Sequence, residues 1–173
     1  TFASAAEADV KAAAGHTDPA TLCQLYRYPR LRPDTTIYGV IGNPVMHSRS
    51  PQIHNRGFRL CDVNAVYLPF LVDSVPSFLR LADLLDIRGV SVTIPHKHEV
   101  IAHLAAGDQA VSSIGACNTL VRGESGWRGM NTDAAGFLRP LVAAGFDRAS
   151  GKATVIGAGG AARSVVYALR TLG

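Results

Sequence analysis

The sequence has few of the features that mark membrane, disordered or disulfide-rich secreted proteins. Its 173 residues include 3 Cys, 7% aromatic residues and 17% charged residues, against 47% hydrophobic residues. No run of about 18 apolar residues occurs, so no membrane-spanning helix is expected. No basic segment followed by an apolar one opens the chain, so no signal peptide is predicted. The hydrophobic fraction argues against a disordered tail, a collagen-like repeat or a coiled coil, and the length suits one domain and part of a second.

Net charge and cysteine are also sparse. The net charge is +4, and the basic residues neither cluster nor alternate with aromatic residues, so neither a nucleic-acid nor a membrane partner is expected. Cys23, Cys61 and Cys117 are odd in number and widely spaced, with no CxxC pattern. They predict reduced thiols in a cytoplasmic protein.

Lysine is the rarer basic residue. Fourteen arginines accompany only three lysines, Lys11, Lys97 and Lys152. A lysine can lose its proton inside a protein, whereas an arginine practically cannot. Each lysine is therefore a candidate for proton chemistry.

Strands and helices are predicted to alternate from residue 35 onwards. The expected strands are residues 36–41, 65–71, 89–94, 116–121, 127–130 and 152–156. The expected helices are residues 51–60, 75–85, 132–144 and 161–172, with helical pieces at 19–26, 98–105 and 108–114. This alternation predicts an α/β fold with an open, mainly parallel sheet and flanking helices.

Two boundaries divide the chain into three expected units. Residues 1–32 are Ala-rich and end in a stiff, Pro- and Arg-containing link, residues 33–148 form the main α/β domain, and residues 149–173 start a second domain. The last unit holds one strand and one helix, which together cannot bury both of their apolar faces. We therefore expect the chain to be a piece of a longer protein, truncated inside a Rossmann domain.

A glycine-rich loop opens that last unit. Gly157 and Gly159, with Ala162, follow the GxGxxA pattern between an expected strand and an expected helix. The glycines permit a tight turn and close approach of a pyrophosphate, whose charge the helix N-terminus favours. The alternative is a tight turn with no ligand. The residue that would separate NAD from NADP falls beyond the last residue given.

Two hydroxyls precede the first long helix. Ser48 and Ser50 stand two residues apart in an extended stretch, so both can face one carboxylate. The alternative is that Ser50 simply caps the helix that follows.

Further polar residues interrupt apolar segments. Thr93 and Lys97 lie near the carboxyl end of a buried strand, where ligands bind in open α/β sheets. The alternative for Lys97 is a surface lysine, although a helix start is a poor place for a cation. Asn118 offers a donor and an acceptor to ligand hydroxyls. Asp133 either opens a helix or meets Lys97 across the end of the sheet. His96 and His98 lack a third ligand, so no metal is expected.

Five ordered motifs, at residues 38–51, 92–97, 115–119, 131–133 and 157–161, resemble shikimate dehydrogenase over about residues 36–173. The resemblance implies reversible, NADPH-dependent reduction of 3-dehydroshikimate to shikimate in the pathway to chorismate and aromatic amino acids. It implies that Lys97 and Asp133 form the catalytic pair. The implied substrate-binding residues are Ser48, Ser50, Thr93, Lys97, Asn118 and Asp133. The implied start of the NADP site is Gly157, Ala158, Gly159, Gly160 and Ala161. The piece itself is expected to be inactive, because it lacks most of the nucleotide sheet.

The first 26 residues resemble the end of a type I dehydroquinase. The resemblance implies a dehydroquinase domain fused upstream, as in the bifunctional plant-type enzyme, and a plastid location if the source is a plant or alga. Ala12 and His16 stand where that family has Ser and Gln, which argues against dehydratase activity.

Two other functions remain open. The first is a quinate/shikimate dehydrogenase that uses NAD, although Ser50 favours shikimate. The second is a non-catalytic module that senses shikimate or quinate, although such a module needs no acid–base pair such as Lys97 and Asp133.

Overall fold

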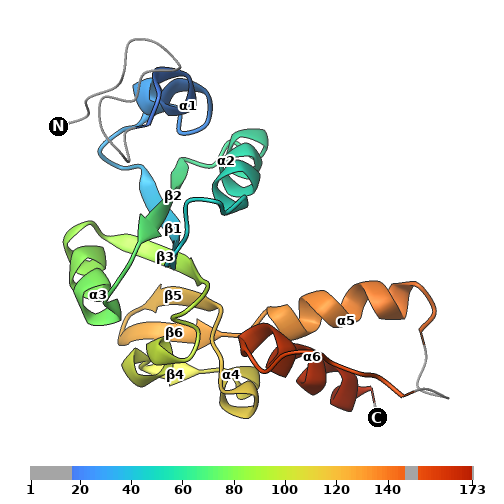
Figure 1. Ribbon diagram of the computed structural model, residues 1–173. Coiled ribbons are helices and arrows are strands. Elements are labelled where there is room, and N and C mark those ends of the chain that lie inside the picture. The colour runs from blue at the N-terminus through green and yellow to red at the C-terminus, as the bar shows by residue number, and fades with distance from the viewer. Residues whose placement is uncertain (1–16, 147–151, 173) are drawn as a thin grey trace.

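A computed structural model describes residues 17–146 and 152–172, and its centre is one six-stranded sheet (Figure 1). The strands are β1 (Thr36–Gly42), β2 (Ala65–Leu71), β3 (Ile87–Val92), β4 (Ala106–Gly107), β5 (Thr119–Gly123) and β6 (Gly126–Met130). Their order across the sheet is β2-β1-β3-β5-β6-β4. Only β5 runs against the others in this sheet, because β3 and β6 both pair with it antiparallel while the remaining pairs are parallel. The predicted open, mainly parallel sheet is confirmed.

Helices flank the sheet and extend beyond one end of it. They are α1 (Pro19–Gln24), η1 (Tyr28–Arg30), α2 (Ser50–Leu60), α3 (Val75–Leu84), η2 (Glu99–His103), α4 (Gln109–Ile114), α5 (Asp133–Ala143) and α6 (Gly160–Thr171). Helix α2 packs on β1 and β2, α3 packs on β3, and α5 lies beside α6, far from α1 (Figure 1). Asp18 caps α1 by accepting from the Thr21 amide at 2.8 Å.

Both faces of the sheet carry a buried core. Successive side chains of a strand point to opposite faces. Accordingly Ile41 joins the larger core with Phe78 of α3, while its neighbour Val40 joins a smaller one with Tyr67. A third cluster packs Ala134 of α5 with Ile114 of α4 and Ala168 of α6, which ties these three helices together.

One predicted strand does not form. Residues 152–156 have no strand conformation, and Ile156 is 96% exposed. A strand needs a neighbour for its N–H and C=O groups, and no strand in the described part of the chain lies beside this segment. The helix after the glycine loop is confirmed, starting one residue earlier than predicted. Ala12 and His16 lie outside the described residues, and the three-unit division stays a prediction.

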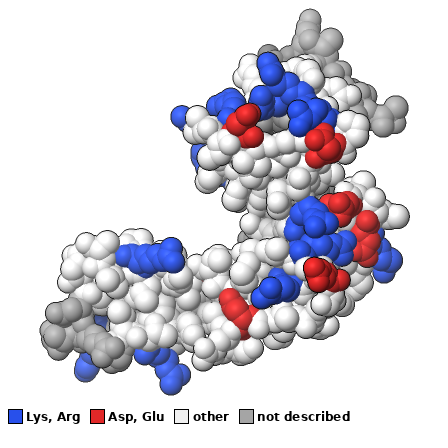
Figure 2. All heavy atoms as spheres, turned by 180° about the vertical axis from the view of Figure 1, so that it is seen from behind, with Lys and Arg blue, Asp and Glu red and all other residues white. Residues whose placement is uncertain are grey.

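Charged side chains are unevenly spread over the surface. A cavity of about 470 Å³ between the α1–η1 segment and α2 is lined by four arginines, Arg27, Arg30, Arg32 and Arg59. Figure 2 shows basic side chains with fewer acidic ones among them at the end that carries α1, and a second mixed group nearer the middle of the molecule. None of the helices within residues 17–146 and 152–172 has the length and apolar character needed to cross a bilayer.

Candidate active site

A polar cavity of about 410 Å³ lies at the carboxyl ends of β1 and β3. In open α/β sheets ligands bind outside these strand ends. The residues that line it come from four segments of the chain, 40–50, 91–97, 118–119 and 132–133, and include all six predicted substrate-binding residues: Ser48, Ser50, Thr93, Lys97, Asn118 and Asp133. The fold therefore brings the predicted substrate site together in one place.

Lys97 and Asp133 form an ion pair in this cavity. Lys97 Nζ donates to Asp133 Oδ2 at 2.5 Å, although the residues are 36 positions apart in sequence. Their side chains are 21% and 33% exposed, so both are partly withdrawn from water yet still open to the cavity. The ammonium has three N–H donors, of which Asp133 takes one. The remaining donors can serve a ligand, and the alternative of an isolated surface lysine is wrong.

Asn118 holds the other oxygen of Asp133. Its Nδ2 donates to Asp133 Oδ1 at 2.7 Å and to Thr132 Oγ1 at 2.9 Å, and its Oδ1 accepts from the Thr132 amide at 3.0 Å. Both hydrogens of the carboxamide are thus used within the protein. In this structure Asn118 orients Asp133, and its predicted contact with ligand hydroxyls stays a prediction.

The two serines lie at the entry to α2. The N-cap residue is Arg49, which makes no side-chain cap hydrogen bond, and Ser50 is already the first helical residue. Ser48 Oγ accepts from the Ser50 amide at 3.2 Å. The alternative in which Ser50 caps this helix is therefore wrong, and its hydroxyl lines the cavity beside that of Ser48.

Three further hydroxyl residues line the same cavity and were not predicted: Ser91, Thr119 and Thr132. Ser91 stands two residues before Thr93, so on an extended strand the two side chains face the same way. Thr119 and Thr132 adjoin Asn118 and Asp133. The alternation of side chains along β3 and the adjacency of Thr119 and Thr132 to predicted site residues could have identified these three residues from the sequence.

Gly42 allows Thr93 to approach β1. A Cβ added at Gly42 would collide with Thr93 Cγ2 and would lie 3.0 Å from the Ile94 carbonyl oxygen. We expect Gly42→Ala to displace Thr93 and to lower the free energy of unfolding by about 1–3 kcal/mol, the usual effect of overpacking. Urea denaturation measures this. Gly57→Ala is the control, because an added Cβ there meets nothing within 4 Å, and equal midpoints for the two variants would contradict the expectation.

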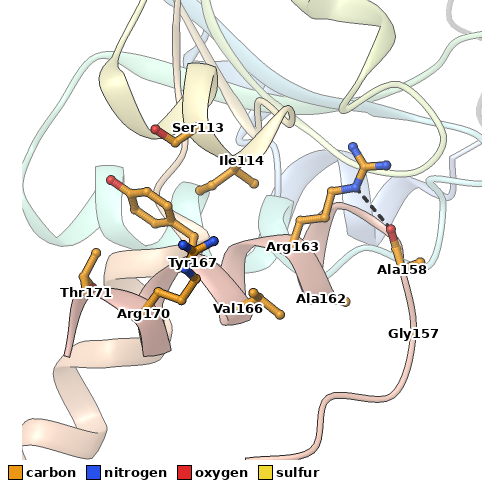
Figure 3. Close-up of a pocket in the computed structure, with 10 residues that line it drawn as sticks. All are labelled: Ser113, Ile114, Gly157, Ala158, Ala162, Arg163, Val166, Tyr167, Arg170 and Thr171. Carbon is orange, nitrogen blue, oxygen red and sulfur yellow. Dashed lines mark hydrogen bonds between the residues drawn. The ribbon is translucent and has the colours of Figure 1, made fainter. Parts of the chain in front are cut away.

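A second cavity, of about 540 Å³, adjoins the first. It lies between the turn after β3 and the glycine loop, and Thr93 and Lys97 line both cavities. On its other side are the predicted cofactor residues Ala158, Gly159, Gly160 and Ala161. Gly157, with φ +118°, makes the turn that precedes them and lines a third cavity between α4 and α6 (Figure 3).

The start of α6 suits an anion. Its N-cap is Gly159, which provides no side-chain cap, and the first helical hydrogen bond runs from the Arg163 amide to the Gly159 carbonyl. The amides of Gly160, Ala161 and Ala162 precede that bond, so no helical carbonyl accepts from them. Free amides and the helix dipole favour a phosphate. Arg163 Nε donates to the Ala158 carbonyl at 3.3 Å and so closes the loop onto the helix (Figure 3).

The two histidines near Lys97 have separate hydrogen-bond partners. His96 is buried, with Nε2 2.7 Å from the Val72 carbonyl and Nδ1 2.9 Å from Glu99. The Nδ1 atom of His98 lies 3.1 Å from the Gly115 carbonyl. No group of three His, Cys, Asp or Glu side chains suited to a metal occurs within residues 17–146 and 152–172.

The sequence of this chain matches known proteins. Residues 40–120 match the family model described as the shikimate dehydrogenase substrate binding domain. The chain is 44% identical over 146 residues to "Shikimate dehydrogenase (NADP(+))" of Moorella thermoacetica, covering 83% of this chain and 50% of that protein. It is 38% identical over 167 residues to the chloroplastic bifunctional 3-dehydroquinate dehydratase/shikimate dehydrogenase of Arabidopsis thaliana, covering 88% and 28%.

Solved structures agree with the sequence matches. Shikimate dehydrogenase from Aquifex aeolicus superposes with a TM-score of 0.78 at 38% identity, over 82% of this chain and 54% of that one. The enzyme from Thermus thermophilus, in complex with NADP(H) and shikimate, gives 0.72 at 37% identity, over 80% and 53%. The chain spans about half the length of such relatives. Residues 40–120 are therefore a shikimate dehydrogenase N-terminal substrate-binding domain, which this chain carries together with part of the region that follows it in that family.

Proposed function

We propose that the protein containing this chain is an NADP-dependent shikimate dehydrogenase, which reversibly reduces 3-dehydroshikimate to shikimate. The observation that carries this proposal is the 2.5 Å pair between Lys97 and Asp133, placed where a polar cavity meets a second cavity bordered by the glycine loop. A hydride-transfer enzyme needs this arrangement, because the acid–base group must reach the oxygen of the same carbon that exchanges hydride with the nicotinamide.

The polar cavity has the size and chemistry for a small hydroxylated acid. Its volume of about 410 Å³ lies within the usual range for ligand sites. Ser48 and Ser50 would donate their hydroxyl hydrogens to the substrate carboxylate. Thr93 and Asn118 would contact ring hydroxyls, and Asn118 would also orient Asp133.

Lys97 and Asp133 carry out the proton transfer. Reduction of a ketone to an alcohol adds a hydride to carbon and a proton to oxygen. Lys97 donates that proton in reduction and accepts it in oxidation, and Asp133 orients the ammonium through the 2.5 Å hydrogen bond. When bound, the nicotinamide cofactor supplies or accepts the hydride.

The residues that would hold the cofactor are Gly157, Ala158, Gly159, Gly160 and Ala161. The uncapped amides at the start of α6 fit a pyrophosphate, and an added Cβ at Gly159 meets nothing within 4 Å, which leaves space for close approach. The choice of NADP over NAD is supported by the names of relatives.

The experiment is a steady-state assay of the native protein. Shikimate and quinate are each offered with NADP and with NAD, and formation of reduced nicotinamide is followed by absorbance. We expect the highest kcat/KM with shikimate and NADP. A preference for quinate or for NAD would favour the quinate/shikimate dehydrogenase alternative. Calorimetric binding of shikimate without turnover by any pair would favour the sensing module.

We also propose that a dehydroquinase domain is fused upstream. The proposal is supported by the resemblance of the first 26 residues to the end of a type I dehydroquinase and by the match to the bifunctional Arabidopsis protein, which covers 88% of this chain against 83% for the Moorella protein. Immunoblotting of the source organism with an antibody to this chain measures the native polypeptide. A band of shikimate dehydrogenase size alone would contradict the fusion. A cytoplasmic location remains a prediction from the three unpaired cysteines, and a plastid location depends on a plant or algal source.

A further inference from the structure

Helix α6 approaches Lys97 closely at Gly160, which has no side chain. A Cβ added at Gly160, the first residue of α6, would lie 3.1 Å from Lys97 Cδ and 3.3 Å from Ala116 Cβ. These separations are shorter than ordinary van der Waals contact, so any larger residue would have to displace the Lys97 stem. The nucleotide-binding pattern requires small residues at Gly157, Gly159 and Ala162, but not at position 160. The contact with Lys97 supplies a separate reason for this glycine.

The same helix reaches Asp133 through Asn131. Ser164, one turn after Gly160, is 1% exposed, and its Oγ lies 3.3 Å from Asn131 Oδ1 and 2.9 Å from the Gly160 carbonyl. Asn131 is also buried; its Oδ1 accepts from the Asp133 amide at 3.1 Å, and its Nδ2 donates to the Ala116 carbonyl at 2.8 Å. The start of α5, which carries Asp133, is thereby linked to α6.

We propose that Gly160, Ser164 and Asn131 are positioning residues, through which α6 holds the Lys97–Asp133 pair in the geometry used for proton transfer. The role of the pair in proton transfer rests on the proposed function, whereas the positioning itself is a property of this chain. The helix that begins at the glycine loop then serves two purposes. Its first amides face the nucleotide. The absence of a side chain at Gly160 and the hydroxyl of Ser164 set the position of the acid–base pair.

The first test follows the lysine side chains directly. In the native protein labelled with carbon-13 lysine, the side-chain Cε signal that disappears in Lys97→Arg is that of Lys97. We expect Gly160→Ala to shift the Lys97 signal and to weaken shikimate binding, measured by calorimetry without nucleotide, by about tenfold. Gly136→Ala on α5 is the matched control, because an added Cβ there meets nothing within 4 Å.

The second test addresses the route through Asn131. Ser164→Ala removes the hydroxyl, and we expect the backbone amide signal of Asp133 to move and shikimate binding to fall by about threefold to tenfold. Ser112→Ala is the control, since the Ser112 hydroxyl also donates to a carbonyl four residues earlier but on an exposed helix face. This variant is expected to leave both the Asp133 amide signal and shikimate binding unchanged.

The outcomes distinguish the proposed positioning role of α6 from the proposed shikimate dehydrogenase function. A Lys97 signal at its wild-type position in folded Gly160→Ala overturns the role of Gly160, and an unmoved Asp133 amide in Ser164→Ala overturns the role of Ser164 and Asn131. If Gly160→Ala does not fold, Ser164→Ala decides whether α6 positions the pair. If the wild-type chain binds no shikimate while the two signals still move, the positioning holds and the assigned substrate is wrong.

Discussion

Replacing Lys97 with methionine is expected to lower kcat of the native protein with shikimate by about 10²–10⁴-fold, the usual contribution of general acid–base catalysis. The KM for shikimate is expected to change far less, because hydroxyl side chains from other segments would still hold the substrate. Methionine keeps most of the volume of the lysine stem but has no proton to give. Steady-state kinetics with saturating nucleotide separates the two constants.

Two controls sharpen this prediction. Lys97→Arg keeps a positive charge near Asp133, but an arginine practically never releases its proton. We therefore expect it to stay nearly as slow as Lys97→Met. Lys152→Met changes an exposed lysine outside both cavities and is expected to leave kcat unchanged. If Lys97→Met retained wild-type kcat, the assignment of Lys97 as the proton donor would be wrong.

The second large effect is expected at Asn55, where leucine should lower the free energy of unfolding by about 2–4 kcal/mol. Asn55, on α2, is 7% exposed and pairs with both backbone groups of Tyr67 on the edge strand β2. Its Nδ2 donates to the Tyr67 carbonyl at 2.8 Å, and its Oδ1 accepts from the Tyr67 amide at 2.9 Å. Leucine has a similar volume but leaves both backbone groups buried without partners, and each such loss costs about 1–3 kcal/mol.

Urea denaturation of the purified chain measures the effect of Asn55→Leu. Gln52→Leu, an amide-to-leucine change at an exposed position of the same helix, is expected to leave the midpoint nearly unchanged. Because α2 also begins with Ser50, we expect Asn55→Leu to weaken shikimate binding as well. A midpoint equal to that of Gln52→Leu would mean that the pairing with Tyr67 contributes nothing to stability.

Most of the elements could be predicted because their signals are local. Residues 65–71 form a strand with the predicted bounds, and α2 starts only one residue before the predicted position. Period-two alternation and a proline at a helix start act over a few residues, so a short stretch of sequence suffices. The strand predicted at residues 152–156 does not form, because strand formation depends on a non-local contact. A strand also requires a neighbour, and local sequence carries no information on whether one lies beside it.

The features of the candidate site also fall into local ones, which the sequence predicts, and non-local ones, which it does not. Residue type and close spacing determined that Ser48 and Ser50 could face one carboxylate, and that the loop from Gly157 could approach a phosphate. Tertiary structure alone decided that Lys97 meets Asp133, 36 positions away, and that Asn118 turns its amide hydrogens toward the protein. The sequence sets the local conformation and chemistry of each segment. Distances between remote side chains depend on strand order and helix packing, which no single segment specifies.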